Sequence, residues 1–118
     1  MLCGDFNARI GNRQECNITE GTHGTLSNLL GNRYIDCDEE NIALRYSKDK
    51  VINMYGHEFL DFCKGTRFIT MNGRIHDKNG LFTYYHPHTG CSVIDYLLVH
   101  AEDINLIDNF CILSKQVE

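Results

Sequence analysis

Two short stretches of the chain place acid and amide side chains where apolar strand residues would be expected. The segment Gly4–Gly11 carries Asp5 and Asn7 directly after the short apolar opening of the chain. Far along the sequence, Asp95 interrupts the apolar run Ser92–Val99, which reads as a buried strand. Functional groups gather where strands end along one rim of an α/β sheet, so these three side chains are expected to converge. This pairing predicts an enzyme.

Asp95 is the sharpest single position. On the face shared by Val93, Leu97 and Val99 its carboxylate would be largely buried, and it would have to be paired, hydrogen-bonded or protonated. It could be an ordinary satisfied side chain that ties one strand to a neighbour, and for Asp95 alone this explanation is favoured. The functional alternative is a carboxylate that orients and charges a catalytic histidine.

The Gly-Asp-x-Asn turn offers a second candidate site. It supplies a carboxylate and an amide two residues apart, on one side of a strand end. The carboxylate of Asp5 could hold a nucleophilic water while the amide of Asn7 steadies a phosphoryl oxygen. A plain Asx turn explains the same residues, because Asp and Asn are favoured in such turns. For this turn alone, the plain Asx explanation is the favoured one.

Composition bounds the class of protein. With 118 residues, of which 42% are hydrophobic and 10% aromatic, the chain can form at most one modest domain with a buried core. The net charge of −5 comes without any run of Lys or Arg, which argues against broad electrostatic capture of nucleic acid. A local phosphate site with a metal ion remains compatible with this charge. The chain contains no apolar run of membrane-spanning length.

The six cysteines are irregularly spaced and form no Cys-x-x-Cys pair, so neither a zinc knuckle nor a thioredoxin-type pair is indicated. Most of them adjoin apolar runs, where a free cysteine behaves as a small hydrophobic residue. We therefore expect a reduced, intracellular protein. His86, His88 and Cys91 could supply three zinc ligands, but a fourth with suitable spacing is missing, and zinc is not favoured.

The elements expected to position these groups follow from periodicity and turn residues. Asn53 can cap a helix that Gly65 would end, with an apolar face of Tyr55, Phe59, Phe62 and Cys63. The other segments are expected to be a strand over 1–3, a long loop over 8–32, a solvated loop or short helix over 33–50, strands over 68–71, 81–85 and 92–99, a short helix or turn over 101–107, and a last strand over 110–113. The strands over 81–85 and 92–99 should form a hairpin.

The acidic patch Asp36–Glu40 superficially resembles a calcium loop. Counted from Asp36, position six is Asn41 rather than Gly and position twelve is Ser47 rather than Glu. An EF-hand is therefore rejected.

Together and in this order, the two motifs resemble the endonuclease/exonuclease/phosphatase superfamily, which has the DNase I-like fold. The likeness is strongest to endonuclease domains of non-LTR retrotransposons and to craniofacial-development-protein-like sequences. It extends over nearly all of the chain and is carried by Gly4–Gly11, Asn53 and Gly56 with Leu60 and Phe62, Thr83, and Ser92–Val99.

The resemblance implies an α/β (α+β) domain, part of a four-layer sandwich, in which 1–118 is a single partial domain, the C-terminal half, truncated at both ends. It also implies phosphodiester hydrolysis assisted by Mg²⁺ or Mn²⁺. Asp5 and Asn7 would handle the attacking water and the scissile phosphate, and Asp5 could also bind the metal. Asp95 would orient the catalytic histidine. Thr83 and Ser92 would contact DNA or support the phosphate pocket.

Two of the family's motifs do not occur in the chain. The family carries an early Asn and a metal-binding Glu in its first half and a Ser-Asp-His motif at its end, and neither motif has a counterpart among these 118 residues. The isolated chain is therefore expected to be an inactive fragment. Its parent would be a DNA endonuclease without small-molecule cofactor, associated with a reverse transcriptase domain, inside the cell and with the nucleus as one candidate compartment. The alternatives are a phosphatase of the same superfamily and a non-catalytic remnant or interaction module.

Overall fold

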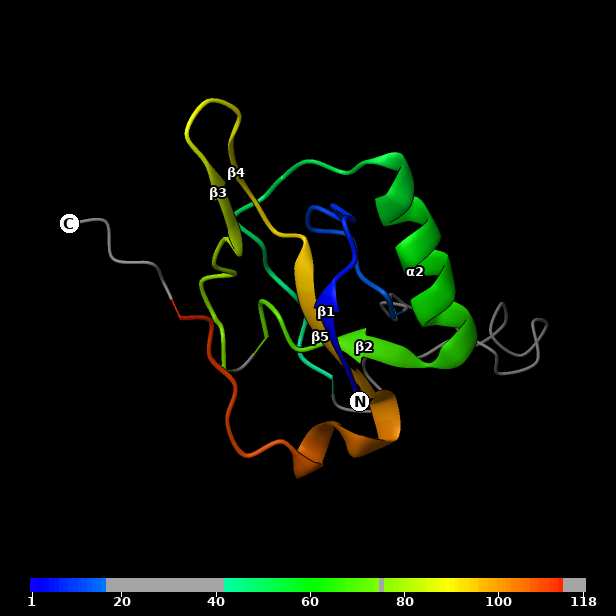
Figure 1. The fold of residues 1–118 in the computed structure, drawn as a ribbon. Helices are drawn as coiled ribbons and strands as arrows, with labels where there is room; N and C mark the ends of the chain where they lie inside the picture. The colour runs from blue at the N-terminus through cyan, green and yellow to red at the C-terminus, as the bar shows by residue number, and fades with distance from the viewer. Residues whose placement is uncertain (17–41, 75, 114–118) are drawn as a thin grey trace.

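The computed structural model describes residues 1–16, 42–74 and 76–113 and forms an α+β domain with two antiparallel sheets (Figure 1). The acidic patch Asp36–Glu40 and most of the expected 8–32 loop lie outside these residues. In chain order the elements are β1 (Leu2–Asp5), α2 (Met54–Thr66), β2 (Phe68–Thr70), β3 (Tyr84–His86), β4 (Gly90–Ser92), β5 (Asp95–His100) and the 3₁₀-helix η1 (Ala101–Leu106).

The larger sheet has three strands in the order β1-β5-β2, and both of its pairings are antiparallel. Side chains alternate along the central strand β5, as a pleated strand requires. Tyr96 and Leu98 pack with α2 in one core, whereas Leu97 and Val99 belong to the core on the other face. The sheet is therefore sandwiched between two apolar cores, which explains the near-continuous apolar sequence of β5.

Helix α2 begins where the sequence predicts it. Asn53 has an extended backbone, and its side-chain Oδ1 accepts a hydrogen bond from the Gly56 N–H at 2.7 Å, as an N-cap does. The buried positions have the spacing of one helical face and are Gly56, Phe59, Leu60 and Cys63. Tyr55 and Phe62, expected on this face, are instead exposed by 57% and 43%. The apolar stripe therefore runs through Gly56 and Leu60, because the glycine lets the helix approach the chain beneath it.

The helix extends beyond the predicted stop at Gly65. It continues to Thr66, whose hydroxyl donates to the Phe62 carbonyl, and Arg67 takes the left-handed conformation with φ 64°. The carbonyl of Arg67 then accepts the Ala101 N–H at 2.9 Å, which ties the helix end to η1. A tertiary contact therefore favours a left-handed Arg over the local preference for glycine.

The expected strand over 92–99 is divided into two. β4 ends at Ser92 and β5 begins at Asp95, each in a different sheet. Between them, the Val93 N–H donates to the Asp49 carboxylate at 3.0 Å, and the Ile94 N–H donates to the Thr83 hydroxyl at 3.0 Å. These side-chain acceptors replace strand partners, so the chain can leave one sheet and enter the other.

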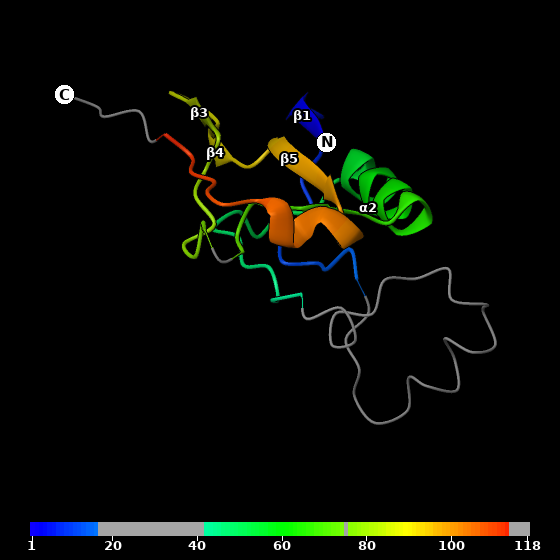
Figure 2. The ribbon, with the colours of Figure 1, turned by 90° about the horizontal axis from the view of Figure 1, so that it is seen from below.

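The expected hairpin forms from β3 and β4, with Tyr84 opposite Ser92. Leu81 was expected in the first strand, but its N–H donates to the Asp77 carboxylate and it precedes β3. The segment 110–113, expected as a last strand, has no regular structure. The hairpin and α2 lie on opposite sides of β5 (Figure 2).

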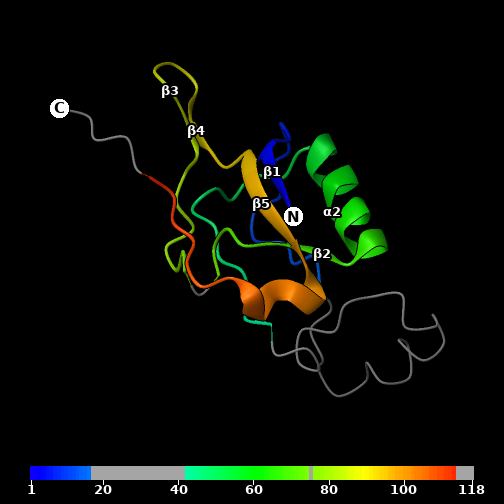
Figure 3. The same ribbon diagram turned by 60° about the horizontal axis from the view of Figure 1, so that its bottom comes forward.

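The remaining segments close the second core. η1 crosses the end of the sheet below β5, and Ile104 packs there against the buried side chains (Figure 3). Residues 42–50 are irregular rather than helical, and Arg45, Ser47 and Asp49 are buried, so the expectation of a solvated segment is wrong for these three. No helix in the described part of the chain is long and apolar enough to cross a membrane.

The cysteines differ from the expectation of reduced thiols at one described position. Cys3, Cys63, Cys91 and Cys111 are free, as expected, whereas Cys16 is disulfide-bonded. Irregular spacing along the sequence therefore did not exclude a disulfide at Cys16.

Candidate functional site

The two sequence motifs meet at one rim of the three-stranded sheet. β1 ends at Asp5 and β5 begins at Asp95, and these residues are direct cross-strand partners in the antiparallel pairing. Directly opposed residues lie on the same face of a sheet, with Cβ atoms about 4.5–5.5 Å apart. The predicted convergence is therefore present, and the antiparallel register of β1 on β5 produces it.

Asn7 is held next to this carboxylate pair. It has φ 52°, a left-handed conformation that Asn tolerates better than most residues, and its N–H donates to Asp5 Oδ1 at 2.8 Å. This is the Asx turn that the sequence allowed as the ordinary explanation. Asp5 and Asn7 are exposed, so the turn presents both residues to solvent at the rim.

Thr83 and Ser92, the residues predicted to support the site, lie next to the start of β5. The Thr83 hydroxyl accepts the Asp95 N–H at 3.1 Å, and the Thr83 N–H donates to the Ser92 carbonyl at 3.0 Å. Ser92 is buried, with 9% of its surface exposed. All five predicted site residues thus lie in one region. The hydrogen bond from Asp95 to Thr83 fixes where β5 begins.

Sequence reasoning missed Asn72, which holds the other side of Asp95. Its Nδ2 donates to the Asp95 carbonyl at 2.9 Å, and its Oδ1 accepts the Leu97 N–H at 3.1 Å. The pair Asn72-Gly73 follows the predicted strand over 68–71 and by itself indicates only a turn. An amide at the end of a predicted strand, next to a glycine, was the available signal.

The carboxylate of Asp95 is less buried than the sequence predicted. Asp95 is half-buried, and its side chain makes no hydrogen bond or ion pair within the described part of the chain. It also faces a second acid, and like charges opposite each other destabilise a strand pair. Two facing carboxylates are an arrangement that a bound cation would relieve.

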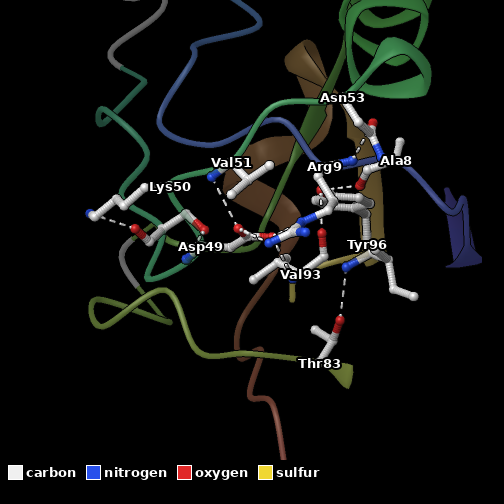
Figure 4. A network of polar contacts seen from close by, with 11 residues as sticks. Ala8, Arg9, Asp49, Lys50, Val51, Asn53, Thr83, Val93 and Tyr96 are labelled. Carbon is white, nitrogen blue, oxygen red and sulfur yellow. Dashed lines mark hydrogen bonds and ion pairs between the residues drawn. The ribbon is translucent and has the colours of Figure 1, made fainter. Parts of the chain in front are cut away.

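A second polar network fixes the loop that follows Asp5 (Figure 4). The guanidinium of Arg9 donates two hydrogen bonds of 2.8 Å to the carboxylate of Asp49, a bidentate pair. Asn53 Oδ1 accepts the Arg9 N–H at 3.0 Å, and the Tyr96 hydroxyl donates to the Ala8 carbonyl at 2.7 Å. The loop that follows Asp5 is therefore held by charged and polar groups from two distant segments, 49–53 and β5.

Asp49 is the centre of this network. Burial alone would raise the pKa of its carboxyl group, but hydrogen bonds from Arg9 and from the backbone N–H groups of Val93 and Val51 outweigh burial, so its pKa is lowered. A carboxyl group with a lowered pKa in the folded state stabilises the fold above its unfolded pKa of about 3.9. That stabilisation is lost as the pH falls through the folded value.

We expect Asp49→Asn to flatten the acid limb of the stability curve. Wild-type stability should fall as the pH drops below about 4, whereas the variant should be less stable at neutral pH and lose less on acidification. Urea unfolding followed by far-UV circular dichroism between about pH 7 and pH 3 measures both slopes. Asp61→Asn on the exposed face of α2 is the control and should keep the wild-type slope. Equal slopes for wild type and Asp49→Asn would contradict the prediction.

The rim has few groups that bind metal by themselves. Within residues 1–16, 42–74 and 76–113, no three or more His, Cys, Asp or Glu side chains form a group that could hold a metal ion. Two carboxylates with an adjacent amide are nevertheless compatible with Mg²⁺, which usually takes one or two carboxylates together with waters and substrate phosphates. No protein-family model, no curated protein and no solved structure matches this chain.

Proposed function

We propose that this chain is part of a Mg²⁺-dependent phosphodiesterase, a DNA endonuclease of the retrotransposon type in the endonuclease/exonuclease/phosphatase superfamily. The observation that supports the proposal is the cross-strand pairing of Asp5 with Asp95. It brings together the two motifs that resemble this superfamily. We propose further that the three-stranded sheet, with α2 on one face, belongs to a four-layer sandwich. DNA and a reverse transcriptase domain would be the partners of the parent protein inside the cell.

In this proposal Asp5 holds the divalent ion and the attacking water, and the Asn7 amide steadies a phosphoryl oxygen. The ion, Mg²⁺ or Mn²⁺, would neutralise charge on the phosphate. The left-handed turn supports these roles because it brings both residues to the exposed rim. Thr83 and Ser92 would support the site indirectly, by holding the start of β5 in place.

Asp95 would orient an imidazole, and its half-buried carboxylate, which has no partner within residues 1–16, 42–74 and 76–113, is suited to that role. Its carboxylate makes no hydrogen bond or ion pair with a histidine among the described residues. The 118 residues also contain no Ser-Asp-His motif. We therefore propose that the chain by itself does not hydrolyse DNA.

Mn²⁺ titration of the ¹⁵N-labelled chain tests the site residue by residue. Paramagnetic Mn²⁺ should broaden the backbone amide signals of Asp5, Asn7 and Asp95 first, because they surround the proposed ion. Asp5→Asn should remove the selective broadening. Asp61→Asn, which changes an exposed carboxylate on α2, should leave it unchanged. Uniform broadening, or broadening that survives Asp5→Asn, would contradict the proposed metal site.

Nicking of supercoiled plasmid with Mg²⁺ tests the reaction. The isolated chain should be inactive, and a parent chain with the metal-binding Glu and the Ser-Asp-His motif should nick DNA in a manner that Asp5→Ala abolishes. Hydrolysis of inositol phosphates in place of DNA would favour the phosphatase alternative. No Mg²⁺-dependent rise in melting temperature, with or without a short duplex, would favour the non-catalytic alternative.

A further inference from the structure

A cavity of about 480 Å³ opens on the face of the sheet that carries Asp95. Its floor includes Cys3 and Leu97, which are cross-strand partners on that face. Phe82 and Tyr85 form one wall, with ring centroids 6.3 Å apart in an edge-to-face arrangement. Phe110, Ile112 and Leu113 of the segment 110–113 also line the cavity. This volume is in the range of small-molecule sites.

Two polar side chains that line the cavity, those of Asn72 and Thr83, already have hydrogen-bond partners within the protein. Both ends of the Asn72 amide bond the backbone of β5, and the Thr83 hydroxyl accepts two backbone N–H groups. The Tyr96 hydroxyl is also used, because it lies within hydrogen-bond distance of the Ala8 and Val93 carbonyls. The Asp95 carboxylate is different, since it has no partner within the described residues.

A carboxylate without a partner in mainly apolar surroundings favours a ligand that brings positive charge. A planar amidinium or guanidinium matches a carboxylate with two parallel hydrogen bonds. Aromatic rings such as Phe82 and Tyr85 add an attraction for an organic cation close to their faces. A metal ion is poorly suited to this wall, because hard cations need several oxygen ligands and the rings supply none.

From this geometry we infer that the cavity beside Asp95 binds a small planar organic cation, with an amidinium or guanidinium group on a flat apolar body. The charged group contacts the Asp95 carboxylate, and the apolar body lies against the Phe82–Tyr85 wall and the 110–113 segment. This inference is independent of the proposed nuclease activity, because it needs neither a divalent ion nor DNA.

Benzamidine is the probe, and benzamide is its neutral isostere. In EDTA, benzamidine should shift the ¹⁵N signals of residues around the cavity, among them Leu97, Phe82 and the Asn72 side-chain amide, with a Kd on the order of 1 mM. Benzamide should bind at least about tenfold more weakly, because it lacks the charge. Equal binding of the two compounds, or shifts away from the cavity, would overturn the inference.

Two variants separate charge from shape. Asp95→Asn keeps the size of the side chain and should weaken benzamidine binding about tenfold while leaving benzamide binding unchanged. Phe110→Ala removes part of the apolar wall and should weaken both compounds. Asp61→Asn should alter neither. Wild-type affinity in Asp95→Asn would overturn the inference. If Asp95→Asn fails to fold, the comparison of the two compounds on wild type decides the question.

Discussion

Replacing Gly56 with alanine should destabilise the fold by about 3 kcal/mol, although alanine is the better helix former. A Cβ atom at this position would lie 1.9 Å from the Arg9 carbonyl oxygen, which belongs to rigid backbone. The helix would have to move away from the loop that follows Asp5. Its cap would weaken as well, because Asn53 Oδ1 bonds both Gly56 N–H and Arg9 N–H.

Gly65→Ala is the matched control on the same helix. A Cβ atom there meets no atom within 4 Å, so this change should stabilise the protein by about 0.5–1 kcal/mol through helix propensity alone. The chain has no tryptophan, so urea unfolding is best followed by far-UV circular dichroism. Similar effects of the two substitutions would show that close packing against Arg9 does not control stability at Gly56.

Replacing Arg74 with methionine should cost about 4 kcal/mol, because it leaves a buried carboxylate without its counter-charge. Arg74 forms an ion pair with Glu15, and the two side chains are only 1% and 0% exposed. Arg74 also donates to the Thr70 carbonyl at 2.7 Å, and the Thr70 hydroxyl donates to Glu15 at 2.8 Å. One substitution therefore disturbs a buried hydrogen-bond network that links Thr70 and Arg74 to Glu15.

The double variant Glu15→Gln with Arg74→Met tests whether charge is the cause. Glutamine can still accept the hydrogen bonds from Thr70, and the double variant removes both charges of the Arg74–Glu15 ion pair. It should be about 2 kcal/mol more stable than Arg74→Met alone. A double variant as unstable as the sum of the two single changes would mean that lost packing, rather than an unpaired charge, dominates.

The parts of the fold that depend on local signals could be predicted from sequence. Asn53 marks the start of α2 through its side chain, and the apolar run over 96–99 identifies β5 as a buried strand. The predictions of an α+β fold and of a hairpin, which also depend on local signals, are confirmed. The meeting of Asp5 with Asp95 was also predicted, although its antiparallel origin was not.

The remainder depends on contacts between distant residues, which no local pattern encodes. Asp49 and Arg45 were interpreted as solvated, yet both are buried, because their partners lie in segments remote in sequence. The break before Asp95 follows from the Thr83 hydroxyl, which a propensity for strand cannot reveal. The helix stop at Arg67 depends in the same way on a carbonyl that bonds Ala101.

The alignment of β1 on β5 has a further consequence for any variant of the chain. Because neighbouring residues of a strand point to opposite faces, a slip of β1 by one residue would send Asp5 to the helix side of the sheet and away from Asp95. The Phe6 N–H bonds the Ile94 carbonyl at 2.9 Å, and the Phe6 ring packs on Phe59, so both contacts resist such a slip. Insertions or deletions near Phe6 should therefore separate the two acids even where the sheet itself survives.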